Sequence, residues 1–168
     1  SEGDFICFQE SGSTLNSEAL FKMYRFLNKV NDAEIIYSDN DYFEKKYSTR
    51  AVPFFKPDWS PHLFLSMNYL EPFCIIKKEI LEKINFDDIS SISPFYDIMI
   101  NSTEISTKIM HFSLPICTIH KKKSEEEHVK EEIKIISKHL DRKKIMATVS
   151  QGILPNTYKI QYTNETEP

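Results

Sequence analysis

The sequence predicts an α/β fold in which a sheet carries flanking helices and is followed by one more helix and a β-pair. Residues 4–8 and 33–37 are short apolar runs typical of buried strands, and a segment with helical periodicity lies between them. Strand, helix, strand is the order of a parallel α/β unit. After residue 121, an amphipathic segment and two alternating segments predict the added helix and β-pair.

The first helix is predicted to begin at Asn16 or Ser17 as N-cap. Apolar residues at the spacing i, i+3, i+4, i+7 indicate one buried face. These positions are Leu20, Met23, Tyr24, Leu27 and Val30. A polar turn is expected at residues 9–14 and an acidic turn at residues 38–41. Both follow a strand, and active sites of parallel α/β sheets lie beyond the carboxyl ends of the strands.

The middle of the chain is predicted to alternate loops with short elements. Residues 42–50 are polar and indicate a loop, and residues 53–61, rich in aromatics and proline, indicate an ordered segment without regular structure. Ser60 is the expected cap of a short helix, with Pro61 in its first turn. The remaining elements are strands at 73–77, 108–112 and 116–120, and helices at 78–84 and 94–103.

The last part of the chain has a pattern of its own. Ser124 and Glu127 fit a capping box, and a helical apolar stripe follows. The stripe consists of Val129, Ile133, Ile136 and Leu140. We therefore divide the chain into residues 1–121 and a connector at 122–168, formed by the helix and β-pair. The helix is expected to dock on the first part, and a partner domain is the alternative.

Composition excludes several classes of protein. The net charge of -4 makes nucleic acid an unexpected partner, because binding to it needs clustered positive charge. The sequence has three glycines, too few for the closely spaced glycines of a dinucleotide fingerprint or a P-loop. Cys7, Cys74 and Cys117 have no close spacing, which indicates buried thiols in a reducing cytosol. With no transmembrane segment or signal peptide visible, we expect a cytoplasmic protein that can work at the inner face of the membrane.

The most specific motif is Phe-Phe-Lys-Pro-Asp-Trp-Ser-Pro at residues 54–61, followed by Asn68 and Tyr69. With Ile-Tyr-Ser-Asp-Asn-Asp at residues 36–41, it resembles the second half of family 2 glycosyltransferases that build bacterial surface polysaccharides. Residues 3–20 are similar to the segment that carries the family's Asp-x-Asp motif.

This resemblance implies the A-type glycosyltransferase fold, also called the nucleotide-diphospho-sugar transferase fold, as the C-terminal half of a domain. Residues 153–168 resemble the connector to a second transferase domain in tandem enzymes. The resemblance thus implies a longer parent protein, a neighbouring transferase domain, and a sugar nucleotide and a glycan acceptor as substrates.

Family members hold the diphosphate of the donor with two carboxylates and a divalent metal, Mg or Mn. The matching positions are Glu10 and Gly12, and glycine offers no carboxylate. His120 matches a histidine that contributes to the metal in the family, with Thr118 as the other possible register. Glu10 and His120 are thus the candidate metal ligands, and a plain turn and a surface histidine are the alternatives.

The family's catalytic helix resembles the segment that begins with Tyr96 and Asp97. A general base must accept a proton from the acceptor hydroxyl. The family has a carboxylate directly before the Tyr-Asp pair, where this chain has Phe95, which accepts no proton. Asp97 remains as the catalytic candidate, with helix capping or a solvated role as the alternative. His111, in an apolar strand, is expected to be a packed residue.

Six residues form the candidate substrate-binding set: Asp39, Asp41, Lys56, Asp58, Trp59 and Asn68. Two acids separated by one residue at a strand end can bind a metal, sugar hydroxyls or Arg50, and a turn-forming role is the equal alternative. Aromatic rings such as Trp59 can stack on a sugar, although aromatic clusters more often belong to a core.

The sequence thus predicts a fragment of a nucleotide-sugar-dependent glycosyltransferase of surface polysaccharide assembly, with degenerate metal and base positions and no activity alone. One alternative is an active enzyme in which Asp39, Asp41 and Asp97 replace the missing groups. The other is a non-catalytic module that binds glycan or protein through the Trp59 region and the helix after residue 124.

Overall fold

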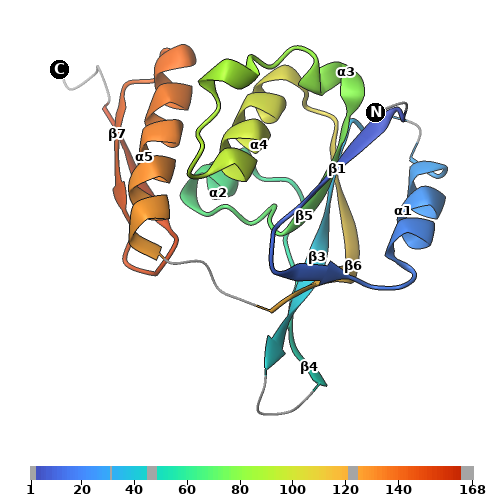
Figure 1. The fold of residues 1–168 in the computed structure, drawn as a ribbon. Coiled ribbons are helices and arrows are strands. Elements are labelled where there is room, and N and C mark those ends of the chain that lie inside the picture. The colour runs from blue at the N-terminus through green and yellow to red at the C-terminus, as the bar shows by residue number, and fades with distance from the viewer. Residues whose placement is uncertain (1–2, 31, 45–48, 121–124, 164–168) are drawn as a thin grey trace.

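The computed structural model describes residues 3–30, 32–44, 49–120 and 125–163. Its main sheet has six strands in the order β1-β5-β3-β6-β2, with β4 paired to β3, and a second sheet consists of β7 and β8 (Figure 1). The strands are β1 Phe5–Gln9, β2 Ser13–Leu15, β3 Ile35–Glu44, β4 Thr49–Phe54, β5 Phe73–Lys77, β6 Ile109–Ile119, β7 Ala147–Gln151 and β8 Tyr158–Tyr162. The helices are α1 Ala19–Leu27, α2 Pro61–Ser66, α3 Lys78–Leu81, α4 Pro94–Ile105 and α5 Glu125–Arg142, with a 3-10 turn at Phe86–Asp88.

The main sheet is mixed. β3 and β6 are parallel, whereas β5 lies antiparallel between β1 and β3. β1, β3 and β6 therefore share one direction, as the strand-helix-strand order predicted. The predicted α/β class, with a sheet, flanking helices, a C-terminal helix and a β-pair, is confirmed.

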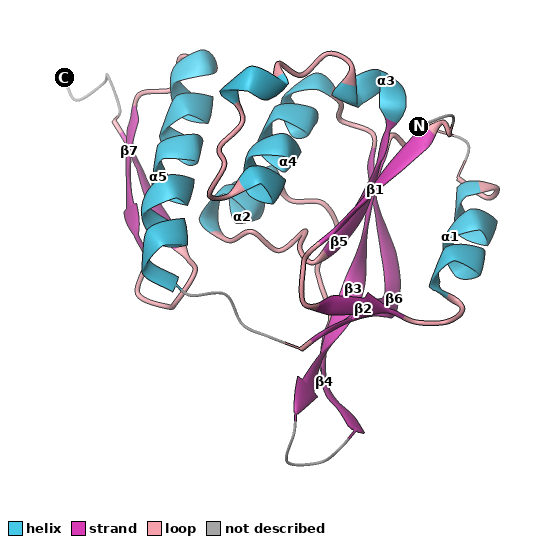
Figure 2. Cartoon of the chain, viewed as in Figure 1, coloured by secondary structure: helices cyan, strands magenta, loops and turns pink. Residues whose placement is uncertain are grey.

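Helices cover both faces of the sheet (Figure 2): α1 lies on one face, and α2, α4 and α5 lie on the other. The alternation of β3 explains the two cores, because successive side chains of a strand point to opposite faces. Ile35 joins the core under α2, α4 and α5, and Ile36 joins the core under α1. Both residues are fully buried.

The acidic turn expected at residues 38–41 is wrong, because these residues lie inside β3. The loop expected at 42–50 is wrong too, since β3 and β4 form a hairpin there, with residues 45–48 outside the described part. β3 pairs with β6 along this stretch, and the ladder satisfies backbone groups that a turn would otherwise bond locally. Tertiary pairing therefore overrides the turn propensity of Asp and Asn.

β6 is one strand where two were expected. Pro115 lies in its interior and has no N–H to donate. The pairing with β3 accommodates it through register shifts on both sides of Asp39. A proline that interrupts a strand pattern thus marks an irregular ladder here and not a strand end.

Two expectations about the first 30 residues are wrong in detail. α1 begins after Glu18, and no side chain caps it. Its buried residues are Ala19 and Met23, whereas Leu20 and Tyr24 are each 66% exposed, so the buried stripe is rotated from the predicted one. β1 is only partly buried, because it lies at the edge of the described sheet.

The C-terminal helix docks on the sheet-containing part, as expected. Val129, Ile136 and Leu140 are buried in the same core as Ile35, and β7 and β8 form the expected pair. Ser124 of the expected capping box lies outside the described residues. The boundary between residues 121 and 122 stays a prediction. In the described part, none of the helices has the length and apolar character that crossing a bilayer requires.

Candidate functional site

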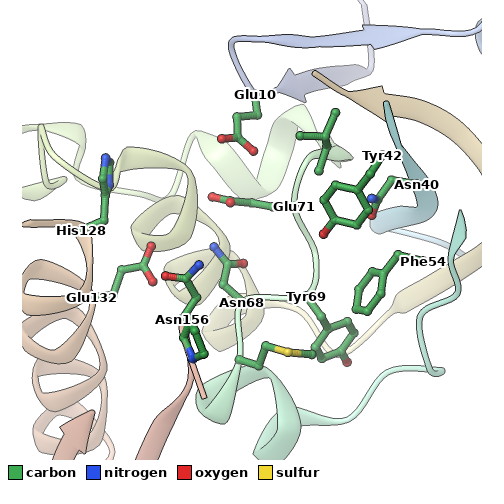
Figure 3. A pocket seen from close by; sticks show the side chains of 13 residues that line it. Glu10, Asn40, Tyr42, Phe54, Asn68, Tyr69, Glu71, His128, Glu132 and Asn156 are labelled. Carbon is green, nitrogen blue, oxygen red and sulfur yellow. The ribbon is translucent and has the colours of Figure 1, made fainter. Parts of the chain in front are cut away.

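A polar cavity of about 280 Å³ lies where the end of β1 faces the C-terminal helix (Figure 3). Glu10 follows β1, Asn40 belongs to β3, and Asn68 and Glu71 come from the segment between α2 and β5. α5 contributes His128 and Glu132, and the loop between β7 and β8 contributes Asn156. The cavity therefore joins the sheet-containing part to the C-terminal helix and β-pair.

Asn68 is the predicted substrate-binding residue that the structure places in this cavity. Its side-chain oxygen and nitrogen are both buried, and neither has a hydrogen-bond partner among the described residues. Buried amide groups are normally hydrogen-bonded. The Asn68 side chain can therefore supply one acceptor and two donors to a ligand.

Lys56 was also expected to bind substrate, but its ammonium group is buried beneath the cavity wall. Nζ donates to the carbonyl oxygens of Glu71 at 2.6 Å and Leu70 at 3.4 Å. Burial lowers the pKa of Lys56 to about 7. Lys56 thus fixes the backbone that presents Glu71.

Asp39 lies in the same network and not in a turn, so the turn-forming alternative is wrong. Its Oδ1 accepts a hydrogen bond from the Lys56 backbone N–H at 2.8 Å and lies 2.8 Å from His111 Nε2. His111 stacks on Tyr37, and its Nδ1 lies 3.3 Å from the exposed Asp58. His111 is packed in the strand, as expected, and its ring also lies between the carboxylates of Asp39 and Asp58.

Asp41 and Trp59 lie away from open space. Asp41 is buried in β3, opposite Thr118 of β6. Trp59 is partly buried and packs on the rings of Phe64 and Tyr69, with centroid separations of 5.4 and 6.5 Å. These contacts favour a core role for Trp59 over stacking on a sugar.

Asp97 is a buried residue of α4 that binds other parts of the fold. Its Oδ2 accepts from the Ser90 backbone N–H at 2.9 Å, and its Oδ1 accepts from Asn101 Nδ2 at 2.9 Å. Oδ2 thus fixes the segment before α4, and Oδ1 bonds to the next turn of the same helix. A catalytic role for Asp97 stays a prediction, and the contacts favour its structural alternative.

The candidate metal ligands do not meet in a metal-binding group. Glu10 lines the cavity, whereas His120 is exposed, with Nε2 at 2.8 Å from Thr14 Oγ1 and its ring next to Phe43. Among the described residues, no three His, Cys, Asp or Glu side chains are arranged to hold a metal ion. The donor set therefore does not fit a metal held by these residues alone.

A second, more apolar cavity of about 670 Å³ lies between the end of β1 and the start of α4. Phe8, Phe95 and Ile98 contribute its apolar wall. Glu10 and His128 line both cavities and thus mark the boundary between them.

The sequence prediction missed His128 and Glu132, although a signal for Glu132 exists. Glu132 lies three residues after Val129 and four before Ile136, so it interrupts the apolar stripe on the buried face. A carboxylate in that position is only 7% exposed and needs partners. His128, one turn earlier on the same helix, has no comparable sequence signal.

The cavity combines amides, carboxylates and the rings of Tyr42, Phe54 and Tyr69. Amides and carboxylates pair with hydroxyl groups, and aromatic faces accept the apolar face of a sugar ring. The arrangement can therefore hold a polyhydroxylated ligand and place one of its hydroxyls next to a proton acceptor.

No family model matches the chain. The O-antigen biosynthesis protein RfbC of Myxococcus xanthus is 26% identical over 173 residues, which cover 95% of this chain and 13% of that protein. TarS 1-349 of S. aureus superposes with a TM-score of 0.59 at 16% identity, and its complex with UDP with 0.55 at 18%. Each alignment covers 83% of this chain and 41% of the TarS chain.

A mycobacterial protein has a TM-score of 0.52 at 12% identity, over 96% of this chain and 56% of that one. The chain thus spans a small part of RfbC and less than half of TarS. The structural likenesses agree with the predicted fold class, an α/β sheet with flanking helices.

Proposed function

We propose that the chain is the acceptor-side half of a glycosyltransferase that builds a bacterial surface polysaccharide from sugar nucleotides. The polar cavity binds the glycan acceptor, and its carbonyl, amide and carboxylate groups orient one hydroxyl for transfer. The nucleotide-binding strands and a neighbouring transferase domain belong to the rest of the polypeptide. The whole enzyme works in the cytoplasm, at the inner face of the membrane where polysaccharide is assembled.

The unpartnered amide of Asn68 carries this proposal. Its two polar groups are buried in a cavity that carboxylates and aromatic rings also line. An amide in this state costs free energy unless solvent or a ligand completes its hydrogen bonds. A sugar hydroxyl, which both donates and accepts, matches it.

The names of the similar proteins support the same class. RfbC is an O-antigen biosynthesis protein, and O-antigen is a surface polysaccharide. TarS 1-349, with the same fold, has been crystallised with UDP, the nucleotide part of many sugar donors. A sugar nucleotide and a glycan acceptor are therefore the substrates we propose for the whole enzyme.

Glu10 can give a divalent ion, Mg or Mn, one carboxylate, and the other ligands must come from outside the described residues. Gly12 and Phe95 match positions at which family 2 glycosyltransferases, the family that the sequence resembles, have carboxylates. We therefore expect the 168-residue chain to be inactive alone, and no step of the proposed reaction depends on a metal held by its residues.

The test is a transfer assay with the complete polypeptide, a panel of labelled sugar nucleotides and free glycan acceptors. We expect transfer by the complete polypeptide and none by the 168-residue chain. Asn68→Ala should raise the KM for the acceptor about 10-fold or more, because it removes the amide's hydrogen bonds, and leave the KM for the donor within about 3-fold. Failure of the complete polypeptide to transfer from any donor would refute the proposal.

A non-catalytic glycan-binding module is the second candidate, and the glycine and phenylalanine at the two motif positions favour it. A glycan array with the 168-residue chain separates the two. Binding to a glycan without sugar nucleotide, combined with no transfer by the complete polypeptide, would favour the module.

A further inference from the structure

His128 occupies the boundary between the two cavities, beside the helix start where the base position is lost. It lines the polar cavity with Asn68 (Figure 3). It also lines the apolar cavity with Phe95. It lies on α5, which packs against α4 in the shared core. A proton acceptor at this boundary can reach a hydroxyl bound in the polar cavity.

A chain of hydrogen bonds fixes which nitrogen of His128 is protonated. Nδ1 lies 3.0 Å from Ser93 Oγ, and the Ser93 hydroxyl donates to Glu132 Oε1 at 3.3 Å. Tyr158 donates its phenol proton to Glu132 Oε2, so the carboxylate is an acceptor at both oxygens. With the single Ser93 proton directed to Glu132, Ser93 Oγ is left to accept a proton from Nδ1.

The consequence is an imidazole whose Nδ1–H is bonded to Ser93, so that in the neutral form of the ring the lone pair lies on Nε2. This arrangement resembles the way in which a buried carboxylate orients a catalytic histidine, with a serine hydroxyl inserted between the two groups. Glu132 is 7% exposed and Ser93 is 2% exposed, so water competes little for these bonds. The pair at positions 128 and 132 lies one helical turn apart, which brings both side chains to the same face of α5.

We propose that His128 is the general base of the transfer reaction, a role that rests on the proposed function. Nε2 accepts the proton of the acceptor hydroxyl as the hydroxyl oxygen forms a bond to the anomeric carbon of the sugar nucleotide. The bond from that carbon to the diphosphate oxygen breaks, and its electron pair leaves with the nucleoside diphosphate. The products are the extended glycan, the nucleoside diphosphate and a proton, which resides on His128 until solvent removes it.

Ser93 and Glu132 are positioning residues in this scheme. They hold the Nδ1–H tautomer, and the Glu132 carboxylate stabilises the imidazolium that forms. Other acidic residues of the cavity compete for the role of base, with Glu71 as the clearest rival because its backbone is held by Lys56. Variants of both residues therefore belong in the same test.

The first experiment measures transfer by the complete polypeptide with His128→Gln, which keeps the side-chain size but accepts no proton at neutral pH. We expect kcat to fall about 100-fold or more, with the KM for donor and acceptor within about 3-fold. His62→Gln is the control, because His62 is exposed on α2 and should leave kcat unchanged. Unaltered circular dichroism of both variants excludes misfolding.

If the wild type transfers sugar and His128→Gln keeps its kcat within about 3-fold, the base assignment is wrong and the proposed function stands. A larger loss of kcat in Glu71→Gln than in His128→Gln also overturns the assignment, in favour of Glu71. If the wild type transfers no sugar, both proposals fail together.

The second experiment needs no turnover. Nitrogen-15 NMR of the five histidine rings in the 168-residue chain, with His128 assigned from its absence in His128→Gln, reports which ring nitrogen carries the proton. We expect Nδ1–H and an unprotonated Nε2 for His128, and a shift toward the other tautomer in Ser93→Ala. A predominant Nε2–H form in the wild type would overturn the proposal.

Discussion

Two polar clusters meet near Glu71 and differ in how completely their hydrogen bonds are satisfied. In the closed cluster, Asp39 binds the Lys56 backbone and His111, and the Lys56 ammonium binds two carbonyl oxygens. In the open cluster, which lines the cavity, Asn68 keeps both polar groups without a partner among the described residues. Asp39 and Lys56 are buried residues, whereas Asn68 is half-buried with both polar side-chain atoms buried.

This difference in hydrogen bonding indicates which residues stabilise the fold and which are available to a ligand. A buried polar group destabilises the fold unless it is hydrogen-bonded, so a closed cluster supports the structure that surrounds it. An open cluster with space beside it completes its bonds with solvent or with a ligand. The contacts of Asp39 and Lys56, both expected to bind substrate, favour a role in the scaffold, and Asn68 is the residue of the three that we propose for binding.

The largest predicted change in the free energy of unfolding follows from the loss of the Asp39 carboxylate. Asp39→Ala leaves the Lys56 N–H and His111 Nε2 without an acceptor in a buried site, where the Asp39 side chain is 2% exposed and that of His111 is 6% exposed. We expect the free energy of unfolding to fall by about 3 kcal/mol. Urea denaturation followed by circular dichroism measures this change.

Asp58→Ala is the matched control, because Asp58 lies 3.3 Å from the other nitrogen of the same ring but is 97% exposed. Its loss should cost less than about 0.5 kcal/mol, since exposed ion pairs contribute little. If Asp39→Ala and Asp58→Ala lowered the free energy of unfolding equally, the buried Asp39 would contribute no more to stability than the exposed Asp58, and the closed-cluster assignment would be wrong.

Much of the fold could be predicted from the sequence. The apolar period located β5 at its observed bounds, and Ser60 with Pro61 located the start of α2, because both signals are local. The course of β3 through Asp39 and Asp41 could not be predicted, since it depends on pairing with β6, more than 70 residues later. Local turn propensity carries no information about such a partner.

The candidate site was less predictable than the fold. Asn68 could be named as a candidate because it closely follows a specific motif, and the structure places it in the cavity. His128 and Ser93 are 35 residues apart and meet only when α5 docks on α4. Lys56 stands in the same motif as Trp59, and nothing in the motif distinguishes a side chain that faces the cavity from one that faces the core. Site residues thus depend on long-range packing that a single sequence does not display.

The buried amino group of Lys56 is expected to have a smaller effect, on the pH dependence of the free energy of unfolding. Its folded-state pKa of about 7 is below the ordinary value of 10.5, so between these values the unfolded chain binds a proton that the folded chain lacks. The free energy of unfolding therefore rises with pH in this window. Relative to Lys56→Met, the wild type should gain about 1–2 kcal/mol between pH 7 and 8.5.

The comparison stops near pH 8.5, where free thiols begin to ionise. Burial raises the pKa of Cys74 and Cys117 in the folded chain, and partial desolvation raises that of Cys7, which is exposed although a buried thiol was expected. Above this pH, the unfolded chain loses thiol protons that the folded chain keeps, and stability falls with pH. Urea midpoints of both variants at several pH values measure the difference. Parallel pH curves for wild type and Lys56→Met would show that this ammonium is charged at neutral pH and would weaken the closed-cluster assignment.

The smallest effect on stability is predicted for Asn68, the residue with the largest expected effect on the acceptor. Asn68→Ala removes an amide that makes no hydrogen bond to the described residues, so the free energy of unfolding should stay constant or rise by up to about 1 kcal/mol. Asn101→Ala is the matched comparison, since Asn101 donates to the Asp97 carbonyl and carboxylate, and its loss should cost about 1 kcal/mol. If Asn68→Ala costs more than Asn101→Ala in urea denaturation, the Asn68 amide is bonded within the fold, and the open cluster is a part of the scaffold.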